Sequence, residues 1–184
     1  MRCFKKSKGV SPRDFYTPLY ELLDDVTPLK KDCGVLCDAV CCKDGKDGEA
    51  GMLLFPNEAK MFKGKRFAKI VKSSCEYGEK STAKLLICKG KCDRSLRPLA
   101  CRIFPLLPYR HIGEGKKLQI IMDPRAKGMC PLARSLKVEQ LEPEFIEKVT
   151  KVCTEILKLK DGAEYIDMLS DLADQCDFLK KHKA

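Results

Sequence analysis

Cysteine is the residue that most constrains how this chain can fold. The sequence holds 12 cysteines in 184 residues, whereas aromatic residues make up only 7% and tryptophan is absent. Thiols at this density exceed what packing alone requires, so we expect something besides a hydrophobic core to stabilise the chain. Seven of them fall into two groups, and two single cysteines lie between the groups and shortly after the second one, while the other three are near the two ends of the chain. The first group is Cys33, Cys37, Cys41 and Cys42, the second is Cys88, Cys92 and Cys101, and the single ones are Cys75 and Cys130.

The start of the sequence bears on the redox state of these thiols. Residues 1–8 are basic, and residues 9–20 contain Ser, Pro, Arg and Asp instead of the apolar stretch of a secretory signal, so we expect a cytoplasmic protein. In a reducing cytosol, cysteines are more often metal ligands or buried thiols than disulfides. Cys41 and Cys42 are also adjacent, which would strain a disulfide between them. The sequence therefore favours metal binding over a disulfide framework.

The hydropathy and the charge of the sequence limit the kinds of binding partner that we expect. No apolar run approaches the roughly 20 residues of a bilayer-spanning helix, so we expect no membrane partner. The net charge of +10 comes mainly from lysine, with 27 lysines against nine arginines. Lysine is a strongly hydrated point charge, whereas arginine binds phosphates and bases with a planar fork. The excess is therefore more typical of a solvated surface than of a nucleic-acid reader.

The hydrophobic pattern predicts an α+β fold with a loop-rich middle. Thr17 and Pro18 form a helix start ahead of an apolar stripe, and Pro56 begins a second one. Short apolar runs predict strands, two of which flank a turn at Gly113 and Gly115. The expected elements are helices at 18–25 and 56–62, strands at 67–71 and 84–87, and a hairpin within 106–123.

A helical spacing of apolar residues begins at Pro143 and continues to about Leu179, with a break at 160–162. This pattern predicts a C-terminal helical hairpin. We expect residues 12–135 to form a small cysteine-cluster domain stapled by metal, and residues 141–181 to pack on it as part of one structural unit.

The spacing within the first cysteine group suits metal ligation. Thiolate sulfur is a soft, charged donor that binds zinc and iron–sulfur clusters tightly. If residues 33–42 are helical, Cys33, Cys37 and Cys41 lie on one face, and Cys42 lies about 100° away from them. Cys42 would then serve a second metal or another side of a cluster.

The sequence resembles the YkgJ-like cysteine-cluster family, which is described as zinc- or iron-chelating. The resemblance covers residues 33–131 and rests on the Cys41-Cys42 doublet, Cys88 and Cys92, Arg97-Pro98, Cys101-Arg102, Phe104-Pro105 and Cys130. The family's first block has two residues between its cysteines, whereas here three residues separate them. The resemblance implies eight metal ligands. They are Cys33, Cys37, Cys41, Cys42, Cys88, Cys92, Cys101 and Cys130.

The remaining candidates have simpler interpretations. Cys153 and Cys176 occupy apolar positions of the expected helices and are interpreted as packing residues. Cys75 matches no position of the family and stays open as a substitute ligand. We interpret Cys3 as part of the chain end and His111 as a surface residue. Arg97 and Arg102 flank Cys101, where they either favour its thiolate or form ordinary ion pairs.

Motifs of common enzymes are missing from the sequence, which contains no HExxH, GxSxG, P-loop or GxGxxG pattern. A site closed by four cysteines is structural, whereas catalytic zinc keeps one position for water. We therefore expect a metal-binding protein with a mainly structural site for zinc or iron and with metal ions as its partners. Enzymatic activity stays open, and the missing motifs make it the less favoured interpretation. An iron–sulfur redox or methyltransferase-accessory protein is one alternative, and a zinc-dependent nucleic-acid-binding protein is the second.

Overall fold

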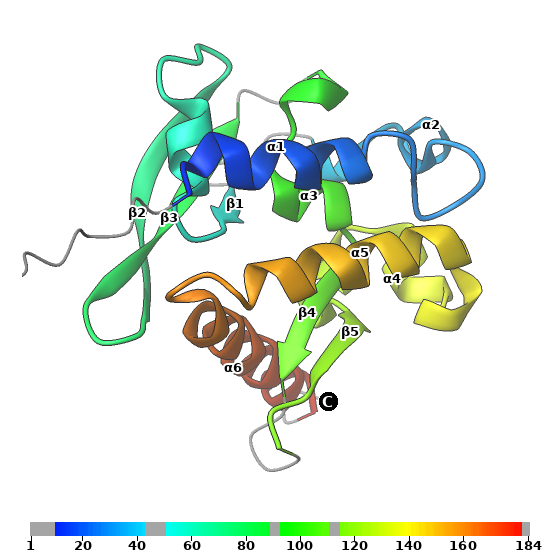
Figure 1. The fold of residues 1–184 in the computed structure, drawn as a ribbon. Coiled ribbons are helices and arrows are strands. Elements are labelled where there is room, and N and C mark those ends of the chain that lie inside the picture. Colours follow the sequence, from blue (N-terminus) through cyan, green and yellow to red (C-terminus); the bar gives the residue numbers. More distant parts are fainter. Residues whose placement is uncertain (1–9, 43–50, 89–92, 111–114, 182–184) are drawn as a thin grey trace, which may run out of the picture.

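The computed structural model describes residues 10–42, 51–88, 93–110 and 115–181, and within them it combines helices with two small antiparallel sheets (Figure 1). This confirms the α+β class. The helices are α1 (Pro12–Leu22), α2 (Cys33–Leu36), α3 (Leu99–Ile103), α4 (Pro131–Ser135), α5 (Pro143–Ile156) and α6 (Gly162–Lys181). The strands are β1 (Met52–Leu54), β2 (Ala68–Tyr77), β3 (Ser81–Cys88), β4 (Leu106–Arg110) and β5 (Leu118–Met122). Short 3-10 helices are η1 (Val40–Cys42), η2 (Glu58–Phe62), η3 (Arg94–Leu96), η4 (Pro124–Gly128) and η5 (Val138–Gln140).

Helix α1 begins earlier than the sequence suggested. Its N-cap is Ser11, whose side chain accepts a hydrogen bond of 3.2 Å from the backbone N–H of Asp14, and Pro12 occupies the first position. Ser11-Pro12 and Thr17-Pro18 are equivalent start signals, and the chain uses the first, so that Pro18 lies inside the helix. The prediction of a start at residue 18 was therefore wrong. The expected helix at 56–62 is the 3-10 helix η2, which begins after Asn57 with a φ of 66°.

The first sheet has three antiparallel strands in the order β1-β3-β2, so β2 is an edge strand. Strands β2 and β3 are longer than predicted and form a hairpin through residues 78–80, with Gly78 at a φ of 59°. The second half of β2 is polar in sequence, yet Cys75 and Tyr77 pack against the main core. The second half of β2 is stabilised by this tertiary contact, so the apolar residues of the sequence alone predicted only the first half of the strand.

The expected hairpin between residues 106 and 123 is confirmed. Strands β4 and β5 pair antiparallel, with Leu106 opposite Met122 and Arg110 opposite Leu118. The side chains of β4 are almost all buried because α5 and α6 both pack against it.

Helices α5 and α6 form the predicted C-terminal hairpin. The turn between them needs a glycine, because a Cβ atom at Gly162 would lie 1.9 Å from the carbonyl oxygen of Ile156. Helix α5 runs beside α1 across the centre of the molecule, and α6 lies below it (Figure 1). Both helices contribute to the main hydrophobic cluster, through fully buried side chains that include Phe145, Val149 and Ile166. The hairpin therefore packs on the rest of the chain. Among the described residues, no helix is long and apolar enough to span a bilayer.

Candidate functional site

Four of the eight cysteines expected to bind metal line one pocket of about 250 Å³. Cys33, Cys37 and Cys41 belong to the first cysteine group, and Cys130 is the residue that directly precedes α4. Most of the other lining side chains are apolar. They include Leu36, Val40, Phe104, Pro105, Met129 and Leu132. Thiols that are distant in the sequence thus face the same small volume.

The first cysteine group lies on two short helical turns and not on one helix. Asp32 caps α2 by accepting a hydrogen bond of 2.9 Å from the backbone N–H of Gly34. Asp38 and Ala39 then adopt φ values of 51° and 48°, which end α2 and redirect the chain into η1. The condition that residues 33–42 form one helix, under which the three cysteines would share a helix face, is therefore not met. Two consecutive left-handed residues break the helix and still leave three cysteines at the same pocket.

The segment of residues 33–42 has no buried side chain. Two of its apolar residues are largely exposed, Val35 at 81% and Leu36 at 67%. Apolar side chains normally supply the free energy that holds a segment on a protein body. This segment lacks that contribution and is placed against the body mainly at the pocket.

Cys130, in contrast, is held firmly by its surroundings. It is buried and packs with Ala126 and Ala133 in a small apolar cluster. Its backbone N–H donates a hydrogen bond of 2.7 Å to the carbonyl oxygen of Ala126. The pocket thus has one fixed thiol and three thiols on an exposed segment.

The surroundings favour the protonated thiols. Burial, with smaller contributions from Asp32, Cys37 and Cys130, raises the pKa of Cys33 to about 11. The pKa of Cys41 is raised above its ordinary value by its contact with Cys42, whose Sγ lies 3.9 Å away, and by burial. A metal ion that binds here would therefore displace protons from the thiols.

Arg97 lies close enough to Cys33 for its positive charge to oppose the rise in the pKa of that thiol. Its Nε atom is buried and has no hydrogen-bond partner. The sequence placed Arg97 beside Cys101 only because the two are neighbours in the chain. Its proximity to the first cysteine group is a long-range contact, which no local signal in the sequence indicates.

Arg102 has a structural role. Its guanidinium forms an ion pair with Asp24, donates hydrogen bonds of 2.9 Å to the carbonyl oxygens of Ser95 and Arg97, and lies 4.8 Å from the centre of the Tyr20 ring. The sequence left open whether Arg102 favours the thiolate of Cys101 or forms an ordinary ion pair, and in the structure it forms the ion pair.

Three of the other expected ligands, Cys42, Cys88 and Cys101, are not among the described residues that line the pocket. Cys88 ends β3 and packs against an apolar cluster that includes Phe62, whereas Cys101 lies half-buried in α3. Cys42 does not line the pocket, but it contacts Cys41, which does. Cys92 lies outside the described residues, as do Cys3 and His111.

The three cysteines with simpler interpretations also lie away from the pocket. Cys75 packs against the main core from β2. Cys153 is fully buried, as expected for a packing residue, and burial raises its pKa to about 12. Cys176 is only half-buried in α6, so it is less enclosed than its helical spacing suggested.

The pocket fits a thiophilic metal in its chemistry, since four thiols line it and no carboxylate does. In the described part of the chain, however, no group of three or more Cys, His, Asp or Glu side chains is arranged so that it could hold a metal ion. The four thiols share a pocket but do not converge on one point.

No protein-family model matches the chain, and neither a curated protein nor a solved structure is similar to it. The resemblance to the YkgJ-like family therefore stays a prediction from the cysteine pattern.

Proposed function

We propose that this chain is a metal-binding protein whose cysteine pocket holds zinc or iron, with a mainly structural role for the metal. Cys33, Cys37, Cys41 and Cys130 would hold the ion. The observation that carries the proposal is that these four thiols, from two distant parts of the chain, line one apolar pocket without any carboxylate. In such a pocket sulfur is the available donor among the lining side chains.

The exposed state of residues 33–42 supports a structural role. Because none of these side chains is buried, the thiols can close around a metal without displacing a core residue. A bound metal would fix the segment to Cys130 and supply the stabilisation that its apolar side chains do not provide. Arg97 would offset part of the negative charge of the thiolates through its unpartnered Nε.

The remaining cysteines of the predicted set are Cys42, Cys88, Cys92 and Cys101. Cys42 adjoins the pocket through its contact with Cys41, so it could complete the same site or begin a second one. Because a zinc ion or an iron–sulfur cluster is held by four thiolates, two such sites would account for all eight ligands. An iron–sulfur centre would also support the alternative of a redox role.

Anaerobic purification followed by elemental analysis tests the proposal. We expect zinc or iron in the wild-type protein and its loss in C37S and C130S, which remove one thiol from each part of the pocket. C176S is the matched control, because Cys176 is half-buried on α6 and lies outside the pocket. Full metal content in both C37S and C130S would refute the assignment. Visible absorption in the metal-loaded protein would identify an iron–sulfur centre, whereas a colourless protein would identify zinc.

A further inference from the structure

One segment of this chain carries several positive charges and no negative charge. Residues 59–75 contain six lysine and arginine residues and no aspartate or glutamate, so this segment carries a charge of +6 in a chain of net charge +10. The six residues are Lys60, Lys63, Lys65, Arg66, Lys69 and Lys72, which we call the cationic row. All of them are exposed, and they follow one another from η2 into the edge strand β2.

The cationic row has no carboxylate partners among the described residues. None of its six side chains takes part in a salt bridge or side-chain hydrogen bond there. Some lysines elsewhere are paired, such as Lys148 with Asp25 and Glu144, and Lys151 with Glu147. A solvated surface mixes the two signs of charge, as the C-terminal helices do, whereas this row does not.

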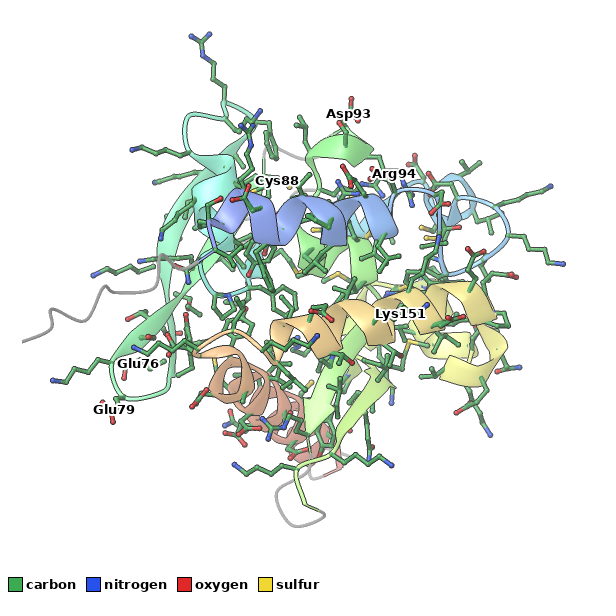
Figure 2. All side chains as sticks on the ribbon, in the orientation of Figure 1. Glu76, Glu79, Cys88, Asp93, Arg94 and Lys151 are labelled. Carbon is green, nitrogen blue, oxygen red and sulfur yellow. The ribbon has the colours of Figure 1, made fainter. Side chains whose placement is uncertain are left out.

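The register of the sheet adds a like-charged pair. Lys72 of the row lies directly opposite Lys84 on β3. Two like charges at opposite positions of an antiparallel pair destabilise the sheet, and a bound anion would remove that cost. Figure 2 shows nitrogen-tipped side chains projecting outward along β2 and the segment before it, while the labelled Glu76 and Glu79 lie at the far tip of the hairpin. Along β2, the first carboxylate is therefore found only after the last residue of the cationic row.

We infer that the cationic row binds the phosphate backbone of nucleic acid without reading its sequence. Lysines are point charges suited to phosphates, and the row follows the chain from η2 through the connection to the first half of β2, so its charges succeed one another as the phosphates of a polyanion do. Base stacking would need an exposed aromatic ring, but Phe67 is only partly exposed and packs edge-on against Phe62, with ring centres 6.2 Å apart. The contact is therefore to phosphates, which carry no sequence information.

An anionic membrane is a less suitable partner for the same charges. Membrane-surface binding combines basic residues with apolar side chains that enter the lipid. The large apolar residues that are well exposed in the described part of the chain are Val10, Val35, Leu36 and Met129, and none of them belongs to the row. The row thus offers charge without an apolar anchor.

Fluorescence anisotropy with the full chain tests this inference. The probes are a labelled 20-nucleotide single-stranded RNA and a 20-base-pair DNA duplex, titrated between 50 and 200 mM salt. We expect K65A/R66A/K69A to lose at least tenfold in affinity at 100 mM salt. Because three phosphate contacts disappear, the slope of log K against log salt should become less steep by about 2 to 3.

Two further variants serve as controls. K137A/K151A/K160A removes the same charge from exposed lysines outside the row and should bind like the wild-type protein. K65R/K69R keeps the charge and should retain the affinity. An equal loss in both triple variants, or no binding of either probe at 50 mM salt, would overturn the inference. Binding to phosphatidylserine vesicles or polyglutamate without binding to either nucleic acid would also overturn it. C37S and C130S should bind both probes normally, so the result is independent of the metal proposal.

Discussion

The backbone N–H of Leu99 donates a hydrogen bond of 2.6 Å to Oε1 of Glu58, so the first residue of α3 is tied to a carboxylate that belongs to η2. Glu58 is completely buried and also accepts hydrogen bonds from the Tyr20 hydroxyl at 2.7 Å and from the backbone N–H of Phe55 at 2.9 Å. One buried side chain thus connects α1, η2 and α3. Its three donors leave it hydrogen-bonded at both oxygens.

Replacing Glu58 by alanine should strongly destabilise the protein. The substitution leaves the N–H groups of Leu99 and Phe55 and the hydroxyl of Tyr20 without their acceptor inside the core. We expect the free energy of unfolding to fall by about 3 kcal/mol or more. Urea denaturation followed by circular dichroism measures this, with E139Q as a control at an exposed glutamate. A loss below about 1 kcal/mol would contradict the role given to Glu58.

Glu58 should also make stability depend on pH. Burial raises the pKa of Glu58 above its ordinary value of 4.5, and the three hydrogen bonds and the positive charge of Arg102 only partly oppose this. The folded state therefore binds the proton more tightly than the unfolded state. The resulting stabilisation is complete below pH 4.5 and is lost as the pH rises through the folded-state pKa.

The comparison of wild type with E58Q isolates this effect, because E58Q cannot titrate at that position. The difference in unfolding free energy between the two proteins should shift in favour of E58Q between pH 5 and pH 7.5. Surface carboxylates such as Asp25 and Glu147 have lowered pKa values and act in the opposite direction, but they are common to both proteins. A difference that stays constant over this range would show that Glu58 does not titrate there.

Arginine at position 102 should not be replaceable by lysine. The guanidinium bonds two carbonyl oxygens, pairs with Asp24 and stacks on Tyr20, whereas an ammonium group cannot make these planar contacts together. We expect R102K to reduce the free energy of unfolding by about 2 kcal/mol, because two partly buried hydrogen bonds to carbonyl oxygens are lost. Thermal unfolding of R102K beside R134K, an exposed arginine, checks this. Equal melting temperatures of the two variants would be the contrary result.

The C-terminal hairpin should be needed for folding. Phe145 on α5 is fully buried in the main hydrophobic cluster. Its replacement by alanine leaves a cavity and should cost about 3 to 5 kcal/mol, whereas T150A on the exposed side of the same helix should cost less than about 0.5 kcal/mol. Denaturant titrations of both variants provide the measurement. Similar midpoints would mean that α5 is dispensable to the core.

Metal removal should loosen residues 33–42 before the rest of the chain. Under the proposed function, the metal fixes a segment that has no buried side chain. Treatment with a zinc- and iron-binding chelator should therefore speed chymotrypsin cleavage after the exposed Leu36, while cleavage at Phe145 in α5 stays slow. Mass spectrometry of the fragments identifies the sites. The same rate of cleavage after Leu36 with and without metal would argue against a structural metal.

Much of the fold could be predicted from local sequence. Helices α5 and α6 follow from the spacing of apolar residues and from the glycine at their turn, and the β4–β5 hairpin follows from two apolar runs around a glycine-containing loop. These features depend on interactions between residues that are close in the chain. The start of α1 could not be predicted, because Ser11-Pro12 and Thr17-Pro18 carry the same local signal. The earlier start is favoured by tertiary packing, since it places Tyr16 as well as Leu19 of the helix in the core.

In the candidate site, too, some features could be predicted from local sequence and others depend on tertiary structure. From local sequence alone one could predict that thiols form the candidate site and that residues 33–42 carry a group of them. Tertiary structure decided that Cys130 joins this group, that Arg97 approaches Cys33, and that Cys88 lies elsewhere, against the cluster around Phe62. Local sequence specifies helical periods, caps and turns through neighbouring residues. The pairing of distant side chains depends on how α1, α5 and both sheets fill one core, because the lowest free energy belongs to the whole packed chain and not to any segment of it.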